Sequence, residues 1–114
     1  MAFSLKIRKV GAAAVVDMSG RLTAGDAVQT LRAAVRGAVD EGTIKFVFNL
    51  GDVSHIDSSG LGELITCYTT IRGRQGDVRL LKLTARAKDL LQMTKLLTVF
   101  EAYDDEQKAL DSLR

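Results

Sequence analysis

The stretch that decides the fold spans residues 49–62 and reads NLGDVSHIDSSGLG. Residues 44–50 are mostly β-branched, aromatic or aliphatic at both odd and even positions, which predicts a strand buried on both faces. Farther on, apolar residues recur at helical spacing, and an arginine ends the series: Leu61, Leu64, Ile65, Tyr68, Ile71 and Arg72. The pattern therefore predicts a strand, a polar turn and a helix. Asp57, Ser58 and Ser59 would lie at the carboxyl end of a central strand, where sites form in open α/β sheets.

The same residues carry a family resemblance. Residues 57–62, DSSGLG, preceded by Asn49-Leu50 and Val53-Ser54, resemble the signature of the STAS domain family and are most similar to that of free-standing bacterial anti-sigma factor antagonists. In that family, a partner anti-sigma factor that is also a protein kinase phosphorylates the serine directly after the aspartate. The resemblance therefore implies phosphorylation at Ser58, with Ser59 as its neighbour, and a serine phosphatase that removes the phosphate.

The resemblance also implies a partner-binding surface around that serine. Its members in this chain would be Arg21, Thr23, His55, Asp57, Ser58, Ser59, Gly60, Leu61 and Gly62. In the best-known antagonists the turn after the second strand reads Gly-Glu-Leu-Asp, whereas here it reads Gly20-Arg21-Leu22-Thr23. A base and a hydroxyl replace two acids, so we expect a less acidic partner-binding surface.

The function that the resemblance implies is partner switching by a binding module that is not an enzyme. With Ser58 unphosphorylated, the chain would sequester an anti-sigma factor serine kinase and so release a sigma factor. Phosphorylation would then release the kinase. The alternative is a STAS adaptor without a kinase cycle, serving as a subunit of a transporter ATPase or of a sensory complex.

Residue chemistry alone leaves other interpretations of this stretch. The hydroxyls of Ser58 and Ser59 could cap the helix, and Asp57 could either activate a serine or merely cap. Asp52, His55 and Ser58 contain every residue type of a Ser-His-Asp triad. However, isoleucine stands where a nucleophile elbow needs its first glycine, which argues against a hydrolase.

Glycine and cysteine usage narrows the remaining possibilities. Gly60 and Gly62 predict either special backbone dihedrals or a surface kept bare for a partner. No Gly-Lys-Ser/Thr follows them, so we expect no phosphate-loop nucleotide site and no cofactor. Cys67 is the only cysteine and there is one histidine, which excludes an intramolecular disulfide and Cys/His metal clusters. We predict that Cys67 is a small buried or half-buried hydrophobe.

The whole chain has the length and composition of one small domain, residues 1–114. It is 46% hydrophobic and 26% charged. A net charge of +2, scattered basic residues and the absence of tryptophan argue against a nucleic-acid partner. The first residues alternate instead of forming a signal core, and no run approaches the ~18 apolar residues of a membrane span. We therefore predict a cytoplasmic protein without direct membrane insertion.

Before the central strand, the pattern predicts a hairpin and a helix. Residues 3–8 alternate apolar and polar, which is typical of a strand with one wet face, and residues 13–19 form its partner. Residues 20–23 leave this second strand. Thr23 is predicted to cap a helix that ends near Gly42. Its inward face would comprise Val28, Leu31, Val35, Ala38 and Val39.

After the central strand, helices and strands alternate. The predicted segments are a helix from Ser58 to between residues 73 and 76, a strand over 77–83, a helix over 85–94 capped by Thr84, an edge strand or irregular apolar segment over 96–100, and a last helix opened by Asp104 or Asp105. Strands separated by helices imply parallel crossovers. We therefore predict an α/β fold in which an N-terminal hairpin and βαβ units form a mixed four- to five-stranded sheet, flanked by about four helices.

Overall fold

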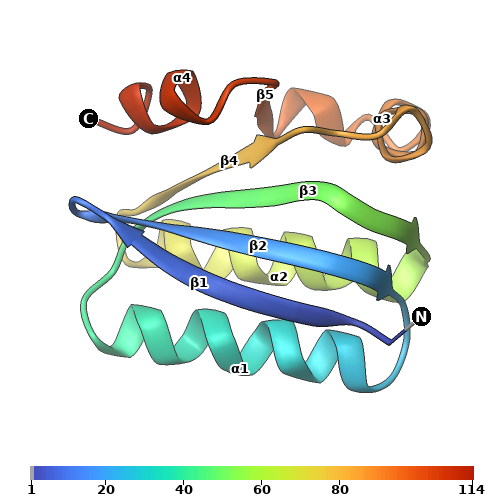
Figure 1. Cartoon of the computed structure of the whole chain (residues 1–114), viewed down its shortest axis with the longest axis horizontal. Coiled ribbons are helices and arrows are strands. Elements are labelled where there is room, and N and C mark those ends of the chain that lie inside the picture. Colours follow the sequence, from blue (N-terminus) through green and yellow to red (C-terminus); the bar gives the residue numbers. More distant parts are fainter. Residues whose placement is uncertain (1) are drawn as a thin grey trace.

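The computed structural model describes residues 2–114, which form a five-stranded mixed sheet and four α-helices (Figure 1). In chain order the elements are β1 (Ser4–Val10), β2 (Ala13–Leu22), α1 (Asp26–Asp40), β3 (Lys45–Ile56), α2 (Ser58–Gly73), β4 (Asp77–Leu81), α3 (Ala85–Met93), the 3-10 helix η1 (Leu96–Thr98), β5 (Glu101–Tyr103) and α4 (Glu106–Asp111). The predicted α/β class is confirmed. None of these helices is long and apolar enough to cross a membrane.

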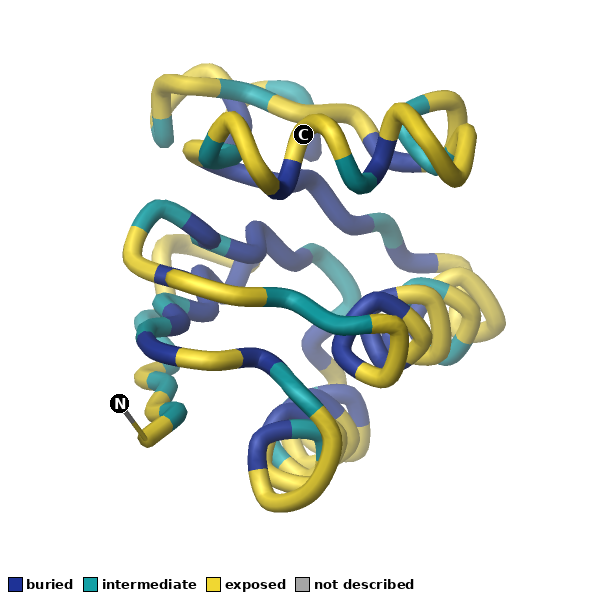
Figure 2. The backbone as a smooth tube through the Cα atoms, turned by 90° about the vertical axis from the view of Figure 1, so that its right-hand side faces the viewer, coloured by how far each residue is buried: buried dark blue, intermediate teal, exposed yellow. Residues whose placement is uncertain are grey.

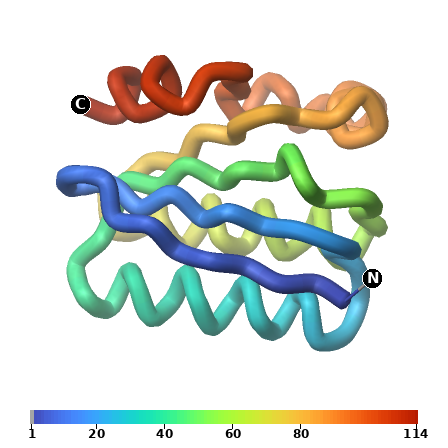
Figure 3. Tube along the Cα trace, viewed as in Figure 1, coloured from blue at the N-terminus to red at the C-terminus, as the bar shows by residue number. Residues whose placement is uncertain are grey.

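The strands lie in the order β1-β2-β3-β4-β5. β1 is antiparallel to β2, and every later pair is parallel, so the predicted hairpin and βαβ units are both confirmed. Because β2 and β3 are parallel neighbours, their carboxyl ends lie at the same end of the sheet. The β2–α1 and β3–α2 connections therefore meet there, on the right in Figure 3.

Helices cover both faces of the sheet. α1 and α2 pack side by side on one face, and α4 lies on the other (Figures 1 and 2). Phe46, Phe48 and Leu50 are fully buried in the cluster that includes α1 and α2. Val47 points the other way and packs in a second cluster with Leu110 of α4. β3 is therefore buried on both faces, as its apolar pattern predicts.

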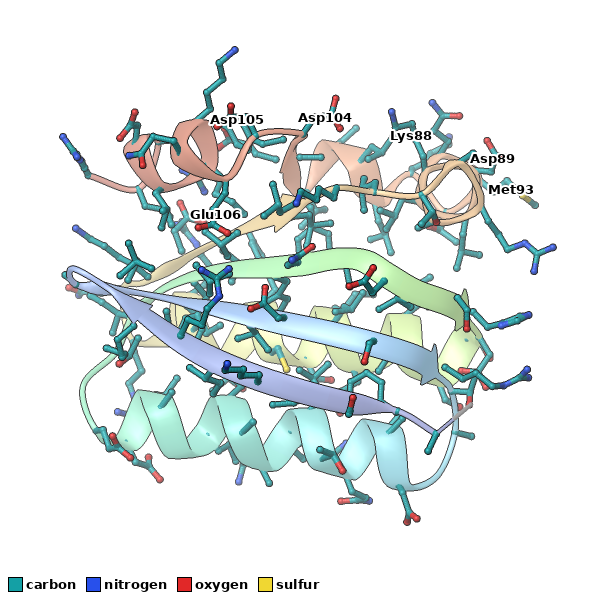
Figure 4. All side chains as sticks on the ribbon, viewed as in Figure 1. Lys88, Asp89, Met93, Asp104, Asp105 and Glu106 are labelled. Atoms are coloured by element: carbon teal, nitrogen blue, oxygen red, sulfur yellow. The ribbon has the colours of Figure 1, made fainter. Side chains whose placement is uncertain are left out.

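A polar network holds α4 against the sheet. Arg8 of β1 binds Asp17 of β2, with 2.6 Å between Nε and Oδ2, and Glu106 of α4, with 2.7 Å between Nη2 and Oε1. The hydrogen bonds from Arg8 hold the pKa of Asp17 below its usual value. Figure 4 shows Glu106 pointing toward the sheet, whereas Asp104 and Asp105 point away from it. In this position, α4 lies far from the end of the sheet where β3 meets α2 (Figure 1).

Two predicted strand ends are wrong, because both strands are longer than their apolar patterns. β2 continues through residues 20–22, and β3 continues through residues 51–56, where we predicted a polar turn. The extensions pair with each other, with Arg21 opposite His55 and Leu22 opposite Ile56. Hydrogen bonds between two distant segments thus stabilise strand geometry in residues that have no strand periodicity.

The predicted helix caps are partly confirmed. Thr84 and Asp105 cap α3 and α4, accepting hydrogen bonds from the backbone N–H groups of Ala87 and Lys108. The prediction that Thr23 caps α1 is wrong. That helix begins at Asp26 after Gly25, which has a φ of 103° and no side-chain cap. A positive φ at this position favours glycine, so the backbone of the loop decides where α1 begins.

The C-terminal third contains one further difference from prediction and settles one alternative that the sequence left open. The predicted strand over residues 77–83 is shorter in the structure: β4 ends at Leu81, because Lys82 has a positive φ of 57° that is incompatible with strand geometry. Residues 96–100 form an irregular segment that contains η1, and the edge strand follows it as β5. Of the two alternatives for residues 96–100, the irregular segment is therefore correct.

Candidate functional site

The ends of β2 and β3 and the first turn of α2 form one continuous structure. Asp57, the residue between β3 and α2, donates its N–H to the carbonyl of Leu22 in β2 at 3.4 Å. A Cβ atom added at Gly60 would overlap the same carbonyl oxygen. The first turn of α2 therefore contacts the backbone at the end of β2, and only glycine permits this approach at position 60.

Asp57 is the N-cap of α2, so the capping interpretation holds for the aspartate and not for the two serines. Its Oδ1 accepts the N–H of Gly60 at 2.8 Å, and its Oδ2 accepts the N–H of Ala24 at 3.0 Å. These two bonds, that from Gly60 first, hold the pKa of Asp57 below its usual value, because both favour the ionised carboxylate. One carboxylate thus joins α2 to the loop before α1.

The two serines that follow Asp57 are exposed. Ser58 is the first residue of α2 and Ser59 the second. Gly62, one turn further on, is also exposed, and a Cβ added there would meet no atom within 4 Å. The hydroxyl of Ser58 therefore lies on an open surface formed by small residues, at the amino end of a helix that tolerates added negative charge.

His55 is oriented by a short chain of hydrogen bonds. The hydroxyl of Ser54 donates to the carbonyl of Gly20 at 3.2 Å, and Nδ1 of His55 lies 3.1 Å from that hydroxyl oxygen. Because the single hydroxyl proton is used by the carbonyl, we assign Nδ1 of His55 as a donor to Ser54. His55 itself is exposed beside Arg21 on the neighbouring strand.

No hydrolytic triad assembles at this end of the sheet. Among the hydrogen bonds within residues 2–114, none joins any two of Asp52, His55 and Ser58, and Nδ1 of His55 is bonded to the hydroxyl of Ser54 instead. Within residues 2–114, no group of three or more histidine, cysteine, aspartate or glutamate side chains could hold a metal ion.

The structure brings together most of the residues that the sequence marks. Those that are exposed or half-buried around the β3–α2 junction are Arg21, Thr23, His55, Asp57, Ser58, Ser59 and Gly62. Gly60 and Leu61 are buried and lie beneath this surface. The sequence did not predict that Ser54 binds His55 or that Ala24 binds Asp57. The bond from Ala24 comes from its backbone N–H, so the residue type gives no sign of it.

Glu63 is a further polar residue that the apolar pattern of α2 did not mark. Its side chain is 1% exposed, and Oε1 accepts a bond from Nη2 of Arg32 in α1 at 2.8 Å. The thiol of Cys67 donates to the other oxygen at 3.4 Å. The Arg32–Glu63 pair connects α1 to α2 behind the exposed serines. Cys67 is buried, as predicted, and its burial raises the pKa of the thiol.

Comparison with known proteins identifies the family. The profile of the STAS domain matches residues 4–109. The chain therefore belongs to the STAS domain family, and the resemblance in residues 57–62 is confirmed.

Several relatives share almost the whole length of the chain. BtrV of Bordetella bronchiseptica, assigned as an anti-sigma factor antagonist, is 24% identical over 105 residues, which cover 92% of this chain and 90% of BtrV. An anti-sigma factor antagonist from Mycobacterium paratuberculosis has a TM-score of 0.85 at 20% identity, with 99% of this chain and 95% of that chain covered.

SpoIIAA is similar in both of its solved states. The phosphorylated form from Bacillus gives a TM-score of 0.77 at 23% identity, with 97% of this chain and 100% of that chain covered. The unphosphorylated form, described as an anti-sigma factor antagonist, gives 0.76 at 23% identity over 97% and 98%. These likenesses show a shared fold.

Proposed function

We propose that this chain is an anti-sigma factor antagonist that switches partners through Ser58. The observation that carries the proposal is an exposed serine hydroxyl, directly after the capping Asp57, at the position of the family signature. The relatives that extend over nearly the whole chain, BtrV among them, support it. The protein would act in the cytoplasm as a binding module and not as an enzyme.

With Ser58 unmodified, the proposed docking surface comprises the exposed residues around the β3–α2 junction. An anti-sigma factor serine kinase binds this surface and releases its sigma factor. The kinase then transfers the γ-phosphoryl group of ATP to Oγ of Ser58, and ADP and the hydroxyl proton leave. A serine phosphatase hydrolyses the phosphate ester and restores the docking surface.

Phosphorylation weakens docking through charge. It adds about −1.5 to −2 charges and three acceptor oxygens to a surface that must lose its water on binding. An unpaired charge in an interface costs on the order of 2–5 kcal/mol, which corresponds to roughly 30- to several-thousand-fold in affinity. The helix amino end accommodates an anion, so release needs no change of fold.

The test maps the acceptor serine. The kinase retrieved by the unmodified chain is incubated with ATP and with wild type, Ser58→Ala or Ser59→Ala, and phosphate is located by mass spectrometry. We expect modification of wild type and Ser59→Ala but not of Ser58→Ala, which should remain bound to the kinase. Ser58→Asp should fold and bind weakly, because it places a charge in the docking surface.

Two results would overturn the proposal. Phosphate that persists in Ser58→Ala and disappears in Ser59→Ala would move the acceptor to Ser59. A chain that is retrieved with a transporter or sensory complex, and is modified by no kinase, would instead be the STAS adaptor.

A further inference from the structure

Arg21 is a cation at the end of β2, and it has no ionic partner among the described residues. It is exposed, and the ion pairs formed within residues 2–114 do not include it. Two acids lie nearby. Asp57 is committed to two backbone N–H groups, and Asp26 lines the same surface hollow as Arg21 without forming an ion pair with it.

The end of β2, which carries Arg21, contacts the first turn of α2, which carries Ser58. Leu22 accepts the N–H of Asp57 through its carbonyl, and the same oxygen lies against Gly60. Ser58 follows Asp57, whose N–H binds Leu22, and Arg21 precedes Leu22. The two residues therefore flank the same backbone contact. The register of β2 and β3 also shifts between Gly20 and Arg21, and such irregularities re-aim the side chains next to sites.

We propose that Arg21 is the intrachain counter-ion of a phosphate on Ser58. The inference rests on the proposed function, because it requires that Ser58 carries phosphate. A guanidinium presents a planar fork of donors that fits two phosphate oxygens, which makes arginine the preferred side chain for such a pair.

This pairing gives the switch two effects. In the unmodified chain Arg21 is available to a carboxylate of the partner, so the surface suits a partner with an acidic residue at that point. In the phosphorylated chain the phosphate occupies Arg21 and the net charge of the pair is negative. The same modification then removes an attractive group and adds a repulsive one.

A second arginine at this end of the sheet allows a matched control. Arg86 of α3 is exposed and lines a different hollow together with His55, on the side of the sheet where α3 lies. His55 donates to Ser54 and is the opposite neighbour of Arg21 on β3. Substitution of Arg86 therefore removes one positive charge from the same end of the molecule without touching β2.

The experiment introduces phosphoserine at position 58 of the full chain during synthesis, so that no kinase is needed. The second ionisation of the phosphate is followed by phosphorus NMR in wild type, Arg21→Gln, Arg21→Lys and Arg86→Gln. A surface ion pair should lower the phosphate pKa of wild type by about half a pH unit relative to Arg21→Gln. Arg86→Gln should match wild type, and Arg21→Lys should lie between wild type and Arg21→Gln.

Salt provides a second readout. The difference between wild type and Arg21→Gln should shrink at about 1 M salt, because an exposed pair is screened. Equal phosphate pKa values in wild type and Arg21→Gln would overturn the role of Arg21. A phosphate pKa that rises in Arg86→Gln as much as in Arg21→Gln would overturn it as well. Because the phosphate is introduced synthetically, this result is independent of whether a kinase modifies Ser58.

Discussion

Gly60 and Gly62 stand two residues apart in α2 and have opposite surroundings. At Gly60, a Cβ atom would overlap the carbonyl of Leu22, so the glycine is required by the contact between α2 and β2. At Gly62, no atom lies within 4 Å of an added Cβ. Neither glycine has a positive φ, so the special dihedrals that the sequence suggested occur at neither position. Gly60 is required by a close backbone approach that the sequence did not suggest, whereas Gly62 leaves a bare surface.

Alanine substitution should separate these roles. Gly60→Ala should destabilise the fold by about 1–3 kcal/mol, because α2 must shift away from β2. Gly62→Ala should stabilise it by up to about 1 kcal/mol, since alanine is the better helix former at an open position. Urea denaturation of both variants measures the difference. Equal stability of the two variants would contradict the close contact at Gly60.

Asp57 makes the stability of this end of the molecule dependent on pH. The pKa of Asp57 is lowered in the folded state, so its contribution is complete above the pKa of an unfolded aspartate. The contribution is lost as the pH falls through the lower folded-state value. We expect Asp57→Asn to melt below wild type at pH 7, because the amide offers one oxygen to two N–H donors.

The difference in melting temperature between wild type and Asp57→Asn should become smaller as the pH falls, because wild type loses the contribution of the ionised Asp57. Asp52→Asn is the matched control, because it removes an exposed carboxylate near the other end of the same β3 extension. It should change the melting temperature little at any pH. If Asp57→Asn melts below wild type by the same amount at every pH, the hydrogen-bonding geometry of Asp57, and not its charge, explains its contribution to stability.

At the scale of elements, β3 supports the site from within the core. Phe48 is fully buried, and its ring packs edge-to-face on Phe46 with 6.2 Å between centroids. Phe48→Ala should lower the free energy of unfolding by about 3–5 kcal/mol, the usual cost of emptying an aromatic core position. Val10→Ala, at the exposed end of β1, should change it by about 0.5 kcal/mol or less. A denaturation midpoint barely changed in Phe48→Ala would contradict the central position of β3.

In α2, the packing of a neighbouring helix changes which residues are buried. Its apolar stripe correctly predicts that Leu61, Leu64 and Ile71 are buried, but Ile65 is exposed. Glu63 occupies a buried position because Arg32 of α1 reaches its carboxylate. The face of α2 therefore depends on α1, which the periodicity of α2 alone does not reveal.

At the scale of the whole molecule, the site lies where modification should leave the fold unchanged. Ser58 is exposed at one end of the sheet, in the first turn of α2, whereas α4 packs near the opposite end. We expect phosphorylation of Ser58 to shift backbone amide resonances of residues 20–24 and 54–62 and to leave those of α4 unchanged. Comparison of heteronuclear NMR spectra of the two forms tests this. Widespread changes that include α4 would indicate a remodelled fold.

The sequence by itself determined most of the core and the order and type of every element except η1 and β5. Periodicity is a local property, and it places Phe46, Phe48 and Leu50 in a buried strand without reference to any partner. The signature in residues 57–62 likewise determined the family, because it is read from consecutive residues. Capping by Thr84 and Asp105 was predictable for the same reason, since donor and acceptor lie three residues apart.

Only the tertiary structure decided how far β2 and β3 extend, how the cap of α2 joins a second loop and which residues lie beside Ser58. Residues 20–22 and 51–56 are strands because they pair with each other, although about 30 residues separate them. The cap bond that Asp57 accepts from Gly60 is local, whereas its second bond, from the N–H of Ala24, joins α2 to another loop. Each of these features depends on hydrogen bonds between segments that become neighbours only when the chain folds, and no local pattern encodes them.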